Sequence, residues 1–105
     1  MYRIDIFVPS EALNKVRDAV KSYAVSYNGQ YKHCMSWFPV QSMYRAKEGA
    51  TPYHGVVGED TYAEEYILTF RCAVDSTKLS EIINLIKENH PYEDPSIDVV
   101  LLQSW

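Results

Sequence analysis

Two prolines close to the C-terminus place the firmest constraint on how this chain folds. Pro91 has no backbone N–H to donate and disfavours helical geometry in the residue before it, so a helix that approaches it must end before His90. Pro95 restricts Asp94 in the same way. The segment 90–95, which reads HPYEDP, is therefore a stiff connector that carries a histidine, a phenol and two carboxylates.

The N-terminal part of the chain has the pattern of a strand followed by a helix. Apolar and polar residues alternate over 2–8, which is the two-residue period of a half-buried strand. Apolar residues then recur three and four positions apart over 10–24, which predicts an amphipathic helix with Ser10 as its N-cap.

The middle of the chain combines a strand pattern with a long loop. Large side chains alternate with smaller ones over 31–37, until Pro39 interrupts the pattern. Residues 41–46 are expected to continue the strand, or to pair back as a short ribbon, after a bulge or bend near the proline. Residues 47–60 show no sustained period and contain glycine and proline, so we expect a loop of the kind that is usually functional or mobile.

The remaining residues repeat the strand and helix pattern in the order needed for a known fold class. Residues 62–74 predict a strand, and Asp75 or Ser76 is expected to cap a helix that ends at Asn89. Residues 97–103 predict a last strand that is apolar on both faces. The order βαββαβ predicts an α+β, ferredoxin-like fold, with one antiparallel sheet and two helices on a single face.

The predicted sheet has a second face that no helix covers. Nine tyrosines in 105 residues supply side chains suited to half-exposed surfaces. We therefore expect another copy of the chain to cover that face in a homo-oligomer. Trp37 and Trp105 are expected to fill core or subunit contacts.

Length, charge and cysteine content narrow the class of protein. The 105 residues predict a single domain over 1–105, and the charged opening segment without any apolar run of about 18 residues predicts a cytoplasmic protein with no membrane span. Cys34 and Cys72 are expected to be reduced thiols. A net charge of −4 argues against nucleic-acid binding, which needs a basic face.

The charge is unevenly distributed along the chain. Residues 19–47 hold four basic residues and no acid, whereas residues 59–105 hold ten acids and three basic residues. We favour solvated faces of opposite sign as the interpretation. The alternatives are charge complementarity between subunits and a basic pocket for a small anionic ligand.

The motifs of the chain resemble those of a known family. Residues 90–98, HPYEDPSID, resemble the HPYEEPAYD signature of the PII-like domain in the NGG1-interacting-factor-like family, whose members are often called dinuclear-metal or GTP cyclohydrolase type 2-like proteins. The opening IFVP at 6–9, the pattern GxxPxxGxxG over 49–58 and EEY at 64–66 extend the resemblance along the whole chain. The ending is also similar to that of CutA, the divalent-cation tolerance protein, which shares the PII-like fold and forms trimers.

The resemblance implies a non-enzymatic PII/CutA-like subunit that binds or senses a small ligand or a metal ion. A homotrimer is the favoured assembly, and the loop 47–60 stands where PII-like proteins keep a ligand-responsive loop. The longer family members hold paired metal ions in domains that flank the PII-like one. Those domains are absent from this sequence, so the hydrolase activity is not carried over.

The connector supplies the first group of candidate site residues. His90 and Glu93 are candidate ligands of a divalent metal ion, because neutral imidazole and carboxylate together suit such ions. In the alternative, His90 caps the helix while Glu93 and Tyr92 fasten the connector to neighbouring backbone. His54, which departs from the family pattern, either meets His90 or another subunit when the loop folds over, or remains a solvated loop residue.

The loop supplies the second group. Its glycines permit close backbone approach to an anion, and two basic residues precede them. The pattern lacks the lysine-serine ending of a P-loop. In the alternative, the glycines serve only the turns of a hairpin-like excursion. The candidate ligand-binding residues are Arg45, Lys47, Gly49, His54, Gly55, Gly58, His90, Tyr92 and Glu93, of which His54, His90 and Glu93 are the candidate metal ligands.

Catalytic residues are not indicated by any spacing in the chain, since neither a serine, histidine and acid set nor an activated cysteine can be argued. We therefore expect a protein that is not an enzyme, with a divalent metal ion as the candidate cofactor. Two other functions stay open. The chain is a member or accessory of a metal-dependent cyclohydrolase-like family, or it is a structural protein-interaction module whose interface accounts for the tyrosines.

Overall fold

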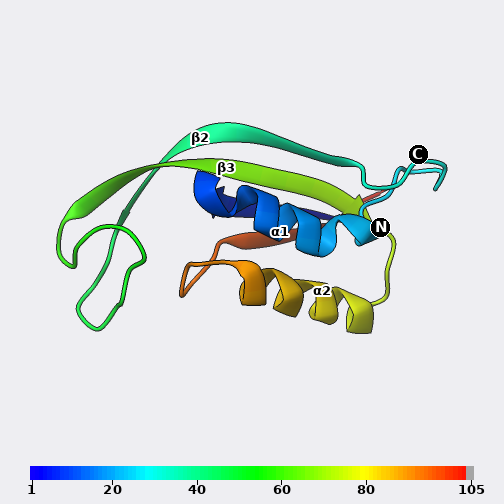
Figure 1. Cartoon of the computed structure of the whole chain (residues 1–105). Helices are drawn as coiled ribbons and strands as arrows, with labels where there is room; N and C mark the ends of the chain where they lie inside the picture. The colour runs from blue at the N-terminus through cyan, green and yellow to red at the C-terminus, as the bar shows by residue number, and fades with distance from the viewer. Residues whose placement is uncertain (104–105) are drawn as a thin grey trace.

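A computed structural model describes residues 1–103 and confirms the predicted α+β, ferredoxin-like architecture. The strands form one antiparallel sheet in the order β2-β3-β1-β4, and both helices lie on the same side of it (Figure 1). The strands and helices are β1 (Tyr2–Pro9), α1 (Leu13–Val20), β2 (Met35–Arg45), β3 (Asp60–Cys72), α2 (Ser76–Asn89) and β4 (Ile97–Leu101).

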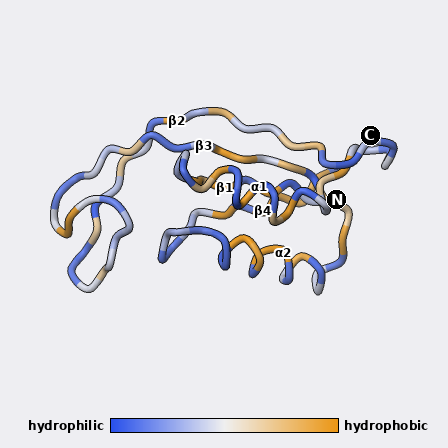
Figure 2. Tube along the Cα trace, viewed as in Figure 1, coloured by the Kyte–Doolittle hydropathy of each residue, from blue (hydrophilic) through white to orange (hydrophobic). Residues whose placement is uncertain are grey.

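The core lies between the helices and the two central strands. Ile4 stands opposite Phe70 and Ile6 opposite Leu68 in the β1–β3 register, and these side chains are all but inaccessible to solvent. Apolar residues of α1 and α2 complete the core, and Figure 2 shows hydrophobic stretches in both β3 and α2. Burial of such side chains is the main favourable term in folding.

The first helix is shorter than the pattern over 10–24 predicts. Its α-helical part is flanked by the 3₁₀ segments Ser10–Ala12 and Lys21–Tyr23. Ser10 does not cap the helix, which corrects the prediction: it lies inside the first 3₁₀ turn, and its hydroxyl contacts the Glu11 carboxylate instead. In α2, by contrast, the side chain of Asp75 accepts a hydrogen bond from the Lys78 backbone N–H at 2.8 Å, as an N-cap should.

Strand β2 differs from its prediction at its start and in its middle. It begins at Met35 rather than near residue 31, because His33 has a left-handed backbone (φ 58°) that breaks the extended run. The prediction of a bulge or bend near Pro39 is wrong. The register with β3 is constant from Met35 opposite Phe70 to Arg45 opposite Asp60. Pro39 is tolerated because β2 is an edge strand of the sheet.

Strands β2 and β3 continue past the end of β1 as a two-stranded ribbon. Strand β1 pairs with β3 only as far as Pro9 opposite Glu65, whereas the β2–β3 pairing reaches Asp60. The loop 46–59 joins the two strands at the far end of this ribbon (Figure 1). The predicted third strand thus begins and ends two residues earlier than expected, at Asp60 and Cys72.

The last strand stops at Leu101, two residues before its predicted end. The Leu102 backbone N–H donates to the Met1 carbonyl oxygen at 2.9 Å, so the two ends of the described chain lie side by side. They lie at the opposite end of the sheet from the loop 46–59 (Figure 1). Trp105 lies outside the described residues. No helix within residues 1–103 has the length and apolar character needed to cross a membrane.

The sheet face opposite the helices keeps apolar side chains in contact with solvent. Phe38 is 47% exposed, and Phe7, Val40 and Ile67 on the same face are half-buried. Strand β4 is apolar on both of its faces, as predicted, with Val99 39% and Val100 37% exposed.

Candidate functional site

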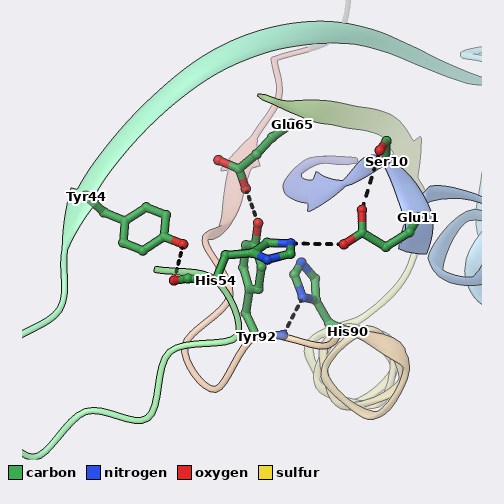
Figure 3. A network of polar contacts seen from close by, with 7 residues as sticks. All are labelled: Ser10, Glu11, Tyr44, His54, Glu65, His90 and Tyr92. Carbon is green, nitrogen blue, oxygen red and sulfur yellow. Dashed lines mark hydrogen bonds and ion pairs between the residues drawn. The ribbon is translucent and has the colours of Figure 1, made fainter. Parts of the chain in front are cut away.

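His90 anchors the connector that follows α2 to the end of β1. Its ring nitrogen Nε2 lies 2.7 Å from the carbonyl oxygen of Phe7. Its Nδ1 lies 3.2 Å from the backbone nitrogen of Tyr92 (Figure 3). Because the Tyr92 N–H must donate to Nδ1, Nε2 carries the proton and donates to the carbonyl. Burial lowers the pKa of His90, which favours this neutral form. Both ring nitrogens are therefore engaged within the chain.

Tyr92 ties the connector to β3 through a carboxylate. Its hydroxyl donates to Oε2 of Glu65 at 2.8 Å, and Glu65 is only 6% exposed (Figure 3). Burial raises the pKa of Tyr92 strongly, and the bond to Glu65 raises it further, so the hydroxyl keeps its proton at physiological pH.

The loop 46–59 folds back from the tip of the ribbon onto the connector. Glu93 accepts from the Thr51 backbone N–H at 2.9 Å through Oε1 and from the Thr51 hydroxyl at 2.7 Å through Oε2. These two bonds lower the pKa of Glu93, so the carboxylate stays ionised and holds the loop.

A second set of contacts holds the same loop at His54. Its Nε2 lies 3.0 Å from Oε1 of Glu11, and the Tyr44 hydroxyl donates to its carbonyl oxygen at 2.7 Å (Figure 3). The Tyr53 ring lies 5.9 Å from the Tyr92 ring, centroid to centroid. The pKa of Glu11 is lowered by a backbone hydrogen bond and, less strongly, by His54. The loop thus contacts β2, the segment after β1 and the connector.

The folded loop, the connector and the helix-free face of the sheet border a half-open cavity of about 430 Å³. Such a volume lies in the range of small-molecule sites. Burial, and secondarily the nearby charge of Glu65, raise the pKa of Tyr44. The side chains that define the chemistry of the cavity are Phe7, Tyr44, Tyr53, Glu65, Tyr92 and Glu93.

The structure gathers some of the predicted site residues and leaves others apart. Tyr92 and Glu93 line the cavity. His54 reaches Glu11 rather than His90. Arg45 forms an ion pair with Asp60 at 2.9 Å on the ribbon and, like Lys47, does not line the cavity.

The candidate metal ligands and the glycines of the loop do not converge on one point. His54, His90 and Glu93 each have separate partners. Within residues 1–103 no three or more His, Cys, Asp or Glu side chains are grouped so that they could hold a metal ion. The glycines occupy turns with positive φ, as for Gly49 at 96°. At Gly55 (φ 89°) a Cβ atom would also overlap the Thr61 side chain.

Sequence reasoning missed four residues of the site: Glu65, Tyr44, Thr51 and Glu11. Glu65 carries a signal that could have been used. It lies on the same face of β3 as Ile67 and Thr69, and a carboxylate that is buried there needs a partner. Thr51 and Glu11 carry no such signal, because ordinary polar residues in a loop and a helix start are expected at the surface.

Comparison with known proteins confirms the resemblance and the fold. No family model matches the chain. A GTP cyclohydrolase 1 type 2 homolog of Halalkalibacterium halodurans is 25% identical over 99 residues, which are 94% of this chain and 26% of that protein. The homolog of the same name in Mycobacterium bovis is 30% identical over 98 residues, 92% of this chain and 25% of the relative. The chain therefore spans about a quarter of the length of these curated relatives.

Solved structures share the fold over nearly the whole chain. A Bacillus cereus protein related to NIF3 has a TM-score of 0.77 at 22% identity, covering 98% of this chain and 26% of that one. The periplasmic divalent cation tolerance protein CutA of Archaeoglobus fulgidus has a TM-score of 0.68 at 21% identity, covering 100% and 87%. The PII-like protein CutA of Nostoc has a TM-score of 0.61 at 22% identity, covering 97% and 81%. The chain thus has the CutA/PII-like fold.

Proposed function

We propose that this chain is a non-enzymatic, homo-oligomeric protein of the PII/CutA-like type that binds a small ligand in the cavity and responds through the loop 46–59. The observation that carries the proposal is the folded loop itself. Thr51 and His54 hold it by polar contacts to Glu93 and Glu11 over a cavity of about 430 Å³. A loop that closes a cavity in this way can couple occupancy of the cavity to its own position.

The contacts that close the loop are of a kind that can open. The side chains of His54 and Glu11 are 47% and 48% exposed, so water competes for their interaction. The two valines of this segment add little apolar packing, as Val56 and Val57 are 56% and 46% exposed. Segments with few buried apolar contacts open at low free-energy cost, as ligand entry requires.

A thermal-shift screen of divalent metal ions, nucleotides, small anions and amines tests the proposal. A ligand that binds only the folded protein stabilises it by about 2.7 kcal/mol at a concentration one hundred times its Kd. Ala50→Phe, which fills the cavity from the loop, should abolish the shift. Val56→Phe, in the same loop but outside the cavity, should retain it. An absence of any shift, or equal shifts in both variants, would contradict the proposal.

The assembly is part of the proposal. Phe38 and Val100 are exposed on the helix-free face of β2 and β4, and another copy of the chain is the partner that we infer for them, in a trimer. Size-exclusion chromatography with light scattering should give three times the mass of the chain. A monomer at micromolar concentration would contradict the proposed assembly but not the proposed ligand binding in the cavity.

A cytoplasmic location fits the two cysteines, which are unpaired: Cys72 is buried at the end of β3, and Cys34 is partly exposed. Labelling of Cys34 by a thiol reagent in freshly lysed cells would support the location.

The names of the curated relatives favour a second candidate, a member or accessory of a metal-dependent cyclohydrolase-like enzyme. Metal analysis of protein purified without chelator or affinity tag distinguishes the two candidates. Two tightly bound ions per chain would favour the second one. If His90→Ala and Glu93→Ala each lowered stability while no ligand bound, a structural interaction module would be the better description.

A further inference from the structure

The residues that line the cavity are acidic and aromatic. Glu65, Glu93 and Asp94 contribute three carboxylates, while Lys, Arg and His are absent from the lining within the described residues. The nearest basic side chain along β2, that of Arg45, pairs with Asp60 on the ribbon. The cavity therefore repels an anion, which argues against the alternative of a basic pocket for a small anionic ligand.

Glu65 lies at the wall of this cavity with only part of its hydrogen-bonding capacity used. It is 6% exposed, and among the described residues the hydroxyl of Tyr92 is its one hydrogen-bond donor, at Oε2. Figure 3 shows the other carboxylate oxygen turned away from Tyr92, on the side where Tyr44 lies. Within the described residues no buried side-chain oxygen lacks a hydrogen-bond partner, so this second oxygen is accessible to solvent. A carboxylate accepts several donors, and a donor group that enters the cavity can bind this oxygen in place of water.

Aromatic rings surround the same space. Tyr53 and Tyr92 lie 5.9 Å apart, and Phe7 and Tyr44 also line the cavity. Ring faces attract cations, and the attraction grows where water is excluded. Carboxylate and aromatic rings together form the environment that ammonium groups prefer.

A metal ion fits this lining less well than an organic cation. Both oxygens of Glu93 are bound to Thr51, which leaves Glu65 as the one buried carboxylate with a free oxygen. A hard cation needs six or more oxygen ligands at short distance. An ammonium group needs one carboxylate and the ring faces.

We propose that the cavity selects a small organic cation, an amine carried as ammonium, with Glu65 as its charge partner and Tyr44, Tyr53 and Tyr92 as the surrounding rings. This inference rests on the proposed function and names the chemical class of its ligand. The cavity volume of about 430 Å³ admits an ammonium group with an aliphatic or single-ring substituent.

Isothermal titration calorimetry with matched probes tests the inference. The probes are benzylammonium and tetramethylammonium, the uncharged benzyl alcohol, the anion benzoate, and Mg²⁺ and Zn²⁺ as chlorides. We expect the two ammonium probes to bind, and the backbone amide signals of Thr51 and Tyr92 to shift in NMR spectra on their addition. The uncharged probe, the anion and the metal ions should bind at least about tenfold more weakly.

Two variants locate the charge partner. Glu65→Gln keeps the shape of the side chain and an acceptor for Tyr92, and it should weaken ammonium binding about tenfold or more. Glu64→Gln makes the same charge change on the exposed, opposite face of β3 and should leave binding unchanged. If Glu65→Gln fails to fold by circular dichroism, the comparison of probes on the unaltered protein still decides.

Each other outcome identifies which proposal fails. Benzoate or benzyl alcohol binding as tightly as benzylammonium, or binding that survives Glu65→Gln, overturns the cation inference and leaves ligand binding in the cavity intact. Tight Mg²⁺ or Zn²⁺ binding without ammonium binding overturns the inference in favour of a metal ion. Failure of every probe here overturns the inference, and failure of the wider screen as well overturns the proposed function.

Discussion

The half of the molecule beneath the helices and the end that carries the loop are held together by different forces. Under α1 and α2, apolar side chains such as Ile6 and Leu68 are shielded from water. At the loop end, Thr51 and His54 hold the loop 46–59 in place by hydrogen bonds to the exposed carboxylates of Glu93 and Glu11. Apolar burial fixes one arrangement, whereas exposed polar contacts exchange readily with water. One chain thus combines a platform fixed by apolar burial with a loop held by polar contacts that are accessible to water.

The largest effect should come from the platform. Ile6→Ala removes a fully buried side chain between β1 and the helices, and it should lower the free energy of unfolding by about 2 to 5 kcal/mol. Val56→Ala, at a 56% exposed loop position, should change it by less than about 0.5 kcal/mol. Urea titration measures both. Equal effects would erase the distinction between the two regions.

The boundary between the regions is tested by Tyr92→Phe. Loss of the hydroxyl leaves the buried carboxylate of Glu65 without its donor, so the free energy of unfolding should fall by about 1 to 3 kcal/mol. Tyr62→Phe removes a hydroxyl from a 76% exposed ring and serves as the control, with no measurable change expected. If the two variants behave alike in urea titration, the connector is held by something other than this bond.

His90 should make stability depend on pH in a defined window. Its pKa is lowered in the folded protein, chiefly by burial, so the unfolded chain takes up the proton more readily. Stability is therefore complete above the unfolded value of about 6.5 and falls as the pH drops below it, towards the lower folded pKa. Unfolding at pH 7.5 and 5.5 measures the loss.

His90→Gln should flatten this dependence, whereas His33→Gln, at an exposed position, should not. The lowered pKa values of Glu11 and Glu93 act in a more acidic range, below about 4.5, and do not contribute between pH 7.5 and 5.5. Stability that rises on going from pH 7.5 to 5.5 would refute the neutral, buried state of His90.

The smallest effect on global stability, and the most local one, should follow from Glu93→Ala. This change removes both acceptors of Thr51 and releases the loop at this point, while the contacts of His54 remain. Amide hydrogen exchange should accelerate for residues 50–55, while exchange in β1 stays as it was. Glu48→Ala, in the same loop at an exposed position, is the control. Accelerated exchange throughout the sheet would mean that the loop and the platform form one cooperative unit.

Local patterns predicted most of the platform. Period-two alternation identified β1 and β3, and helical spacing with Asp75 as cap identified α2. The predicted ends of the first helix and the predicted start of β2 were wrong. Packing sets the 3₁₀ turns that flank the helix, and a hydrogen bond from the His33 N–H to the Ala24 carbonyl holds the left-handed backbone of His33. Propensity does not contain such tertiary influences.

The loop end could be predicted only in part. The prolines singled out Tyr92 and Glu93, but their partners lie far away in sequence: Glu65 is 27 residues from Tyr92, and Thr51 is 42 residues from Glu93. Nothing in the local sequence specifies which residues meet when a ribbon folds back. The basic residues before the loop pointed to an anion, yet Arg45 turns outward to Asp60. Proximity along the chain is a poor guide to the charge of a cavity.

The hydrogen bond between Leu102 and Met1 gives this fold a single point of attachment. Both ends of the described chain lie together, and the loop lies at the opposite end of the sheet (Figure 1). The whole unit could therefore be inserted at a single position of a longer polypeptide. In such an insertion, the cavity beside the loop would face away from the rest of the polypeptide. A circularly permuted protein with residues 1 and 103 linked and new ends elsewhere should therefore keep its fold.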